Sequence, residues 1–388
     1  IERDLRPVLQ DAATHYPAVT VTGPRQSGKT TLCRSAFPDH AYVSLERLDT
    51  REYAREDPRG FLDEYSEEAI FDEVQRVPTL LSWLQVDVDE RPDHGRFILT
   101  GSQHFGLSAA ISQSLAGRTA VLSLLPPSLA ELRRFDQTST DNLIQTLWTG
   151  AFPRIFDRHI PPDRWLADYV TTYAERDVRE VLNVGDLRSF TTFIKLCAGR
   201  TANEVNLSSL ANDAGVTHNT VKAWLSVLET GYLVTLIPAW HRNWRKQLVK
   251  RPKLHFLDTG LACSLLGIRT SDQLRHHPLR GAIFESWVVS EIIKTRLNAG
   301  LDPGVHHFRE SRGLEVDAVL EREGTRVLVE AKSGATVHSE QLRPLERLTA
   351  LLERHQETQP TERVLIYGGD EAHTRYTSAI LPWSMMPI

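Results

Sequence analysis

The stretch GPRQSGKT at residues 23–30 constrains the fold of this chain more than any other feature. Two glycines flank four residues, and a lysine and a threonine follow the second glycine. The apolar run AVTVT precedes this stretch, and TLCRSAF, which suits a helix, follows it. In a strand–loop–helix unit of this kind, the backbone N–H groups of the loop point at bound phosphates. The sequence therefore predicts a nucleotide triphosphate site at residues 23–30.

Two side chains of this loop have separate expected roles. Lys29 is expected to contact the β and γ phosphates and to act in catalysis, and the Thr30 hydroxyl is expected to bind Mg²⁺. The alternative is a coincidental glycine turn, which the flanking strand and helix disfavour. The residues expected to contact ATP in and beside this loop are Gly23, Pro24, Arg25, Gln26, Ser27, Gly28, Lys29, Thr30 and Thr31.

The segment EAIFDE at residues 68–73 supplies the acidic groups that such a site needs. Asp72 ends the apolar run and is expected to hold Mg²⁺ together with Thr30. Glu73 follows it and is expected to orient or deprotonate the attacking water. The alternative is an acidic pair on the surface beyond a strand.

RFILTGS at residues 96–102 is a third apolar segment with a polar end. Ser102, or in its place Gln103, is expected to sense the γ-phosphate; alternatively, Ser102 caps the next helix. Ligands of open α/β sheets bind at the carboxyl ends of the strands, so three such polar ends predict one common site.

The order of apolar and helical segments predicts the domain organisation. Short apolar strands alternate with helical segments up to about residue 125, which indicates an α/β fold with a mainly parallel sheet. We expect a P-loop domain at residues 1–127 and a largely helical region at residues 128–270. A second, smaller α/β domain is expected at residues 271–388.

The motifs GPRQSGKTT, FDEVQRVP, FILTGSQ and SLAGR resemble, in this order, AAA-superfamily ATPases of bacteria and archaea that carry a C-terminal nuclease-like domain. The resemblance implies ATP hydrolysis with Mg²⁺ and a homo-oligomer in which an arginine often completes the site of a neighbouring subunit. Arg118 in SLAGR is the matched arginine, and the motif leaves open whether it acts in its own subunit or in the next. Alternatively, Arg118 is a surface residue that binds backbone carbonyls.

Residues 206–236 have the pattern of a helix-turn-helix within a winged helix at about residues 200–253. Gly215 marks the turn, and Thr217 is a suitable N-cap for the second helix. His218, Asn219 and Lys222 lie outside the apolar stripe of that helix, where DNA readers contact bases. The segment HRNWRKQLVKRPK at residues 241–253 has six lysines and arginines and no acid. The sequence therefore predicts DNA as a partner, with packing against protein as the alternative.

A group of charged residues near the C-terminus forms the second candidate site. Glu285 lies in an apolar helical stripe, which is costly without a partner. If Glu323 and Gly324 form a two-residue hairpin turn, Asp317 falls opposite Glu330. Lys332 then lies on the same strand face as Glu330. Two facing carboxylates repel each other, and a divalent metal and a lysine would relieve the repulsion.

This ordered set resembles the PD-(D/E)XK nuclease superfamily, with a helix glutamate, an aspartate and E-x-K on the next strand. The resemblance implies that Glu285, Asp317 and Glu330 hold Mg²⁺ or Mn²⁺ and that Lys332 is catalytic. Glu315 and Arg309 are nearby polar residues without an assigned role. The alternative is a set of structural salt bridges in a nuclease-derived domain that has lost its activity.

Composition limits the remaining function classes. The net charge of −5 argues against a protein that is basic overall. Three distant cysteines fit no metal-ligand spacing and favour a cytoplasmic location, and no stretch is long enough to span a membrane. We expect a DNA-associated ATPase whose nucleotide state regulates a metal-dependent nuclease. The rivals are a non-nucleolytic ATP switch that binds DNA or protein, and an ATPase that remodels proteins.

Overall fold

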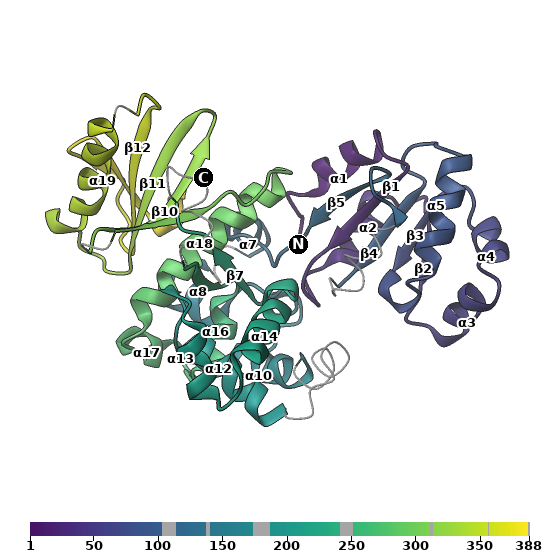
Figure 1. The fold of residues 1–388 in the computed structure, drawn as a ribbon, viewed down its shortest axis with the longest axis horizontal. Helices are drawn as coiled ribbons and strands as arrows, with labels where there is room; N and C mark the ends of the chain where they lie inside the picture. The colour runs from purple at the N-terminus through teal and green to yellow at the C-terminus, as the bar shows by residue number, and fades with distance from the viewer. Residues whose placement is uncertain are drawn as a thin grey trace.

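The computed structural model describes residues 1–102, 114–136, 140–173, 187–240, 251–310, 313–355 and 357–386. The N-terminal α/β part and the C-terminal sheet lie at opposite ends of the molecule, and the helical region lies between them (Figure 1). The helical region therefore separates the N-terminal sheet from the C-terminal sheet.

The N-terminal part is built on a five-stranded parallel sheet in the order β2-β3-β4-β1-β5. The three apolar segments expected to be strands are confirmed as β1, β3 and β4. The strands are β1 (Ala18–Thr22), β2 (Ala41–Ser44), β3 (Ala69–Asp72), β4 (Phe97–Gly101) and β5 (Thr119–Ser123). The helices are α1 (Arg6–Ala13), α2 (Lys29–Ala36), α3 (Leu48–Glu56), α4 (Pro58–Glu64), α5 (Leu80–Glu90) and the 3₁₀ turn η1 (Val74–Arg76).

Alternate residues of the central strands face two different cores. Phe71 and Phe97 pack with α3, α4 and α5 on one face, whereas Ile70 and Ile98 pack with α1 and α2 on the other. Successive side chains of a strand point to opposite faces of a sheet, and here helices cover both faces. This explains why these segments read as continuous apolar runs.

The middle region combines helices with a small antiparallel sheet in the order β6-β8-β7. Ser128 and Glu131 form a capping box at the start of its first helix. The helices are α7 (Leu129–Phe135), α8 (Leu143–Thr149), α9 (Pro153–Asp157), α10 (Pro162–Tyr173), α12 (Leu187–Ala198), α13 (Leu207–Ala214), α14 (His218–Thr230), α16 (Thr259–Leu265) and α17 (Ser271–His276). The strands are β6 (Asn203–Glu204), β7 (Val234–Ile237) and β8 (Lys253–Phe256).

The turn between α13 and α14 has the predicted chemistry. Gly215 has a φ of 67°, and the Thr217 side chain accepts a hydrogen bond from the N–H of Thr220. The expected apolar stripe of α14 is buried, namely Val221, Trp224, Leu225 and Leu228. The two helices and their turn are thus as predicted.

The C-terminal part has a six-stranded mixed sheet in the order β13-β14-β12-β11-β10-β9. Glu323 and Gly324 both have positive φ, as a two-residue hairpin turn requires, and Arg322 pairs with Thr325 as predicted. The helices are α18 (Arg280–Asn298) and α19 (Arg343–Arg354), with 3₁₀ turns η4 (Ser339–Gln341) and η5 (Trp383–Met385). The strands are β9 (His306–Arg309), β10 (Glu315–Arg322), β11 (Thr325–Lys332), β12 (Thr361–Tyr367), β13 (His373–Arg375) and β14 (Ser378–Pro382).

Helix α18 joins the middle region to the C-terminal sheet. One continuous apolar core includes Leu147 of α8 and Cys263 of α16, Val288 of α18, and Val329 of β11. This core contains residues from both sides of the expected border at 270–271. The middle and C-terminal parts therefore share buried side chains.

Two further observations concern the chain as a whole. Cys33, Cys197 and Cys263 are free and buried. Over the ranges that the structure describes, none of the helices combines the length and the apolar character needed to cross a membrane.

Candidate functional site

The loop at residues 23–30 connects β1 to α2, and two of its glycines are needed for backbone reasons. A Cβ atom on Gly23 would lie 2.2 Å from the carbonyl oxygen of Leu124. Gly28 is the N-cap of α2 and has a φ of 95°, a conformation that side chains disfavour. The loop can therefore approach a ligand with its backbone, and the N-terminus of α2 directs N–H groups toward it.

A cavity of about 810 Å³ lies over this loop. Lys29 lines it, and its Nζ donates hydrogen bonds to the carbonyl oxygens of Gly23 and Pro24, at 3.1 and 2.8 Å. Burial lowers the pKa of Lys29, although the negative charges of Glu73 and Asp72 oppose this effect. Ser27 Oγ is buried and has no hydrogen-bond partner among the described residues. The cavity thus presents donors suited to phosphate oxygens.

Asp72 lies beside the start of α2. Its Oδ1 accepts hydrogen bonds from Thr30 Oγ1, at 2.9 Å, and from Thr100 Oγ1. Its Oδ2 accepts one from Tyr42 Oη at 2.8 Å. Burial, followed by the hydrogen bond to Asp72, raises the pKa of Tyr42 to about 12, so the phenol stays a donor. A hydroxyl and a carboxylate oxygen in contact fit a bound Mg²⁺, which takes oxygen ligands.

Glu73 lines the same cavity in a strained backbone conformation, with a φ of 61°. Its N–H donates to Thr100 Oγ1 at 3.3 Å, and its carboxylate accepts a hydrogen bond from the Gln75 side chain. The same Gln75 amide donates to Ser102 Oγ at 3.0 Å. Glu73 and Ser102 are therefore linked through one side chain, as their shared position at the carboxyl edge of the sheet suggested.

Two arginines line this cavity that the sequence patterns did not predict as site residues. Buried Arg3 donates to the carbonyl oxygens of Ser27 and Leu125, at 2.8 and 2.6 Å, and pairs with Glu131 at 3.0 Å. Exposed Arg154 lines the cavity from α9, and its Nη1 donates to the side-chain oxygen of Gln26 at 3.4 Å. Both residues lie far along the chain from their partners, so no local spacing marks them.

Arg118 lies away from the loop at residues 23–30. It immediately precedes β5, which runs parallel to β1, whereas the loop follows the end of β1. The two are thus at opposite edges of the sheet. The guanidinium binds both carboxylate oxygens of Asp89, at 2.5 and 2.9 Å, and donates to the carbonyl oxygen of Ala116 at 3.2 Å. In this arrangement Arg118 cannot reach the phosphates of its own subunit.

The four charged residues expected near the C-terminus do lie close together. Asp317 on β10 and Glu330 and Lys332 on β11 are neighbours across the hairpin, and Glu285 approaches from α18. Asp317 Oδ2 accepts the N–H of Ala331 at 2.9 Å. Lys332 Nζ lies 2.6 Å from Glu330 Oε1 and 3.9 Å from Asp317 Oδ2. Their grouping follows from the predicted hairpin register.

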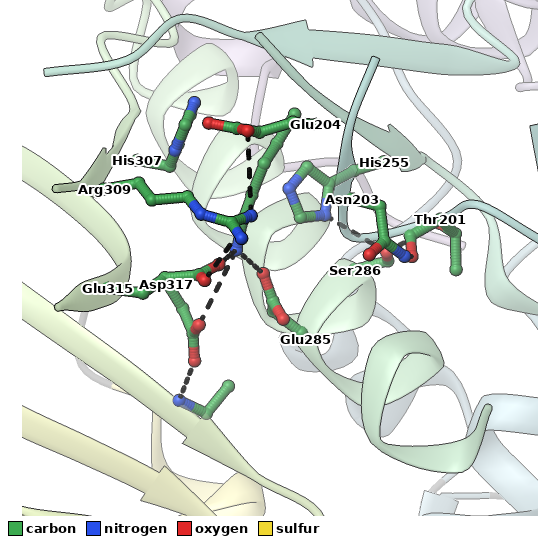
Figure 2. Close-up of polar contacts among 12 residues, drawn as sticks. Thr201, Asn203, Glu204, His255, Glu285, Ser286, His307, Arg309, Glu315 and Asp317 are labelled. Carbon is green, nitrogen blue, oxygen red and sulfur yellow. Dashed lines mark hydrogen bonds and ion pairs between the residues drawn. The ribbon is translucent and has the colours of Figure 1, made fainter. Parts of the chain in front are cut away.

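An unexpected cation occupies this group. Nζ of Lys253, from β8 of the middle region, lies 2.8 Å from Glu285 Oε1, 2.5 Å from Glu315 Oε1 and 3.8 Å from Asp317 Oδ1. Figure 2 shows these three carboxylates pointing toward one centre. Burial by itself lowers the pKa of Lys253, but the three negative charges outweigh this effect and raise it. We call Lys253 and the residues Glu285, Glu315, Asp317, Glu330 and Lys332 the carboxylate cluster.

The expected Mg²⁺ or Mn²⁺ does not fit the cluster in this arrangement. Lys253 and Lys332 take up oxygens of all four carboxylates, although Glu330 Oε2 has no partner among the described residues. Burial, followed by the charge of Asp317, raises the pKa values of Glu285 and Glu330. Across the described part of the chain, no three histidine, cysteine or carboxylate residues are placed to hold a metal.

The predicted DNA contacts are only partly within the described residues. His218, Asn219 and Lys222 of α14 are exposed. Residues 241–250, with most of the basic stretch, lie outside the described residues. Arg251 is exposed, but Lys253 is buried in the carboxylate cluster and cannot contact DNA there. That part of the sequence prediction is wrong because the partners of Lys253 are distant in the sequence.

Three families match consecutive parts of the chain. Residues 15–133 match a family described as an AAA domain. Residues 140–272 match a domain of unknown function, DUF8612, and residues 280–386 match another, DUF4143. The N-terminal part is therefore an AAA domain of the P-loop ATPase type.

Two mycobacterial proteins match across these three parts. The uncharacterized proteins Mb2031c of Mycobacterium bovis and Rv2008c of Mycobacterium tuberculosis are each 30% identical over 344 residues. The match covers 86% of this chain and 74% of each relative.

Solved structures are similar at a lower level. The Walker-type ATPase PABY2304 of Pyrococcus abyssi is 14% identical, with 68% of this chain and 94% of that chain covered and a TM-score of 0.47. AMPPCP-bound DnaA from Aquifex aeolicus is 16% identical, with 58% and 85% covered and a TM-score of 0.30. TM-scores this low do not establish a common overall fold.

Proposed function

The chain belongs to the protein family of Mb2031c and Rv2008c, and from this premise we propose that it hydrolyses ATP with Mg²⁺ and works as a nucleotide-dependent switch. The observation that carries the proposal is the cavity over the loop at residues 23–30. Lys29 and Glu73 both line it, and Thr30 and Asp72 are in contact beside it. These are the groups that bind phosphates, hold a cation and position water.

Each residue has a defined task in this proposal. Lys29 exchanges its two backbone carbonyl partners for the β and γ phosphates of ATP. Thr30 and Asp72 hold Mg²⁺, which neutralises charge on the phosphates when it is bound. Glu73, whose N–H donates to Thr100 Oγ1, orients and deprotonates the attacking water. Ser102 senses the γ-phosphate and is coupled to Glu73 through Gln75.

The contacts around the cavity support a switch. Tyr232 Oη, from the middle region, is 3.1 Å from Thr22 Oγ1 and 2.8 Å from Ser123 Oγ. Thr22 immediately precedes the phosphate loop. Arg154 of α9 also lies at the cavity, so the middle region touches the nucleotide site at two points. A change in the loop on hydrolysis would therefore act directly on the helices and sheet that follow.

DNA is the partner that we propose for the middle region. The helices α13 and α14 and the small antiparallel sheet β6-β8-β7 support this proposal, because a winged helix combines a helix-turn-helix with such a sheet. Residues His218, Asn219 and Lys222 are exposed near the start of α14, where DNA readers contact bases. We do not extend the proposal to DNA cleavage, because Lys253 occupies the carboxylates that a metal would need.

Nucleotide binding tests the first part of the proposal. Lys29→Ala should abolish binding of a fluorescent ATP analogue in the presence of Mg²⁺. Lys195→Ala, which changes an exposed lysine of α12, serves as the control and should bind normally. Equal binding by both variants would contradict the assignment of the site.

DNA binding tests the second part. Lys222→Ala should weaken binding to double-stranded DNA and lower the slope of log affinity against log salt by about one unit. Lys195→Ala again serves as the control. If Lys222→Ala leaves both affinity and slope unchanged, α14 does not contact DNA and the protein-packing alternative is favoured.

A further inference from the structure

The carboxylate cluster lies where two separate parts of the chain meet. Glu285, Glu315, Asp317 and Glu330 belong to the C-terminal part, whereas Lys253 begins strand β8 of the middle region. The Lys253 side chain is 2% exposed, so its charge is removed from water and depends on these partners. Figure 2 places Glu204 and Arg309 next to the same group, and Arg309 Nη1 lies 3.8 Å from Glu315 Oε2.

Backbone hydrogen bonds also join the connection between β7 and β8 to the C-terminal part. Residues 238–252 connect β7 to β8, and both ends of this connection meet β9. The N–H of His307 donates to Pro238 O at 3.0 Å, and the N–H of Trp240 donates to His307 O at 2.6 Å. The His307 ring nitrogen Nε2 contacts Arg251 O at 3.2 Å. Residue 239 thereby forms an isolated parallel bridge with β9.

Side chains add to this junction. The Trp240 ring lies 6.2 Å from the Phe308 ring, and the Arg326 guanidinium lies 4.8 Å from the centre of the Trp240 ring. The junction thus has backbone, aromatic and ionic contacts between the β7–β8 hairpin and the C-terminal part. Lys253 makes the ionic part.

We infer that the Lys253 ammonium takes the position of a divalent cation, so that the carboxylate cluster is an ionic clamp between the β7–β8 hairpin and the C-terminal domain and not a metal centre. Lys253 brings the positive charge that the three nearby carboxylates need and carries it on the chain itself. The clamp fixes the start of β8 to α18 and β10, and the backbone hydrogen bonds of His307 fix the other end of the connection to β9. The C-terminal domain therefore positions this hairpin.

The clamp accounts for features that a metal centre leaves unexplained. An oxygen ligand of Mg²⁺ or Mn²⁺ has to face the ion, but Glu285 Oε1 and Glu315 Oε1 face Lys253 Nζ. Asp317 Oδ2 accepts a backbone N–H and so is also engaged. A metal could enter only if Lys253 withdrew, which would leave its charge buried and unpaired or draw β8 away from its place.

Metal titration tests the inference directly. Mn²⁺ binding is measured by electron paramagnetic resonance without nucleotide for wild type, Asp317→Asn, Lys253→Met and the double variant. Wild type and Asp317→Asn should bind the same amount of Mn²⁺. Lys253→Met should gain one saturable Mn²⁺ site, which the double variant lacks. A wild-type Mn²⁺ site that Asp317→Asn removes would overturn the inference.

Thermal unfolding tests the clamp independently. Lys253→Met should lower the melting temperature more than Lys195→Met, an exposed-lysine control, and saturating Mn²⁺ should restore part of the loss. If Lys253→Met melts like wild type and gains no Mn²⁺ site, the clamp is wrong. If Lys253→Met fails to fold, the dependence on Lys253 is supported, and the comparison of wild type with Asp317→Asn decides about the metal.

Discussion

Lys253 Nζ lies 2.8 Å from Glu285 Oε1, and this contact joins two parts of the chain that the sequence assigns to different domains. Glu285 therefore has the partner that its place in an apolar stripe required. The partner is a lysine of the middle region and not a metal held within the C-terminal part. Glu285, Asp317, Glu330 and Lys332 are grouped as expected, yet Glu285 and Asp317 lie beside a lysine of the middle region.

Arg154 should contribute to ATP binding from the middle region. It is exposed at the cavity and contacts Gln26 of the phosphate loop. A hydrogen bond to a charged group is worth about 1.5–3 kcal/mol, so Arg154→Ala should weaken ATP binding about 10-fold or more. Titration with a fluorescent ATP analogue measures this effect. Arg158→Ala is the matched control, and equal affinities in the two variants would remove Arg154 from the site.

Arg3 should stabilise the fold through a buried ion pair. Its partner Glu131 is fully buried, and removing one member of such a pair typically costs about 3–5 kcal/mol. Chemical denaturation should therefore show that Arg3→Met lowers the free energy of unfolding by about 3–5 kcal/mol. Arg6→Met, which loses a backbone contact at the surface of α1, should cost much less. Similar losses would show that the ion pair contributes little.

The same pair predicts a pH dependence. Burial alone raises the pKa of Glu131, but Arg3 and backbone N–H groups outweigh this effect and lower it below the ordinary value of 4.5. A glutamate with a lowered folded-state pKa stabilises the protein above about pH 4.5, and this stability is lost as the pH falls through the folded-state pKa. Chemical denaturation at a series of pH values from 7 downward gives the free energy of unfolding at each pH. This free energy should fall more steeply for wild type than for Glu131→Gln. Parallel declines would contradict the prediction.

Local sequence patterns predicted the helices, strands and turns, but they did not predict the contacts between the N-terminal, middle and C-terminal parts of the chain. The loop at residues 23–30, the hairpin turn at Glu323 and the cap at Thr217 depend on residues close in the chain, and all three elements form as predicted. The positions of Arg3, Arg154 and Lys253 depend on partners far along the chain. No spacing rule reports such contacts, because they arise only when the helices and sheets pack.

Arg118 should act on a neighbouring subunit. It lies at the sheet edge opposite the phosphate loop of its own chain, bound to Asp89. Arg118→Ala should keep wild-type ATP affinity but lose much of the turnover, and turnover per chain in wild type should rise with protein concentration as subunits associate. A wild-type protein that is monomeric and fully active would contradict this role.

The central claim is that Glu73 enables hydrolysis of ATP bound at the loop of residues 23–30. Phosphate release at saturating ATP and Mg²⁺ tests it most directly, with Glu90→Gln, an exposed glutamate of α5, as the control. A general base typically contributes about 10²–10⁴-fold, so Glu73→Gln should bind ATP normally and turn it over at least about 100-fold more slowly than wild type. Wild-type turnover in Glu73→Gln, or no turnover in wild type, would contradict the account.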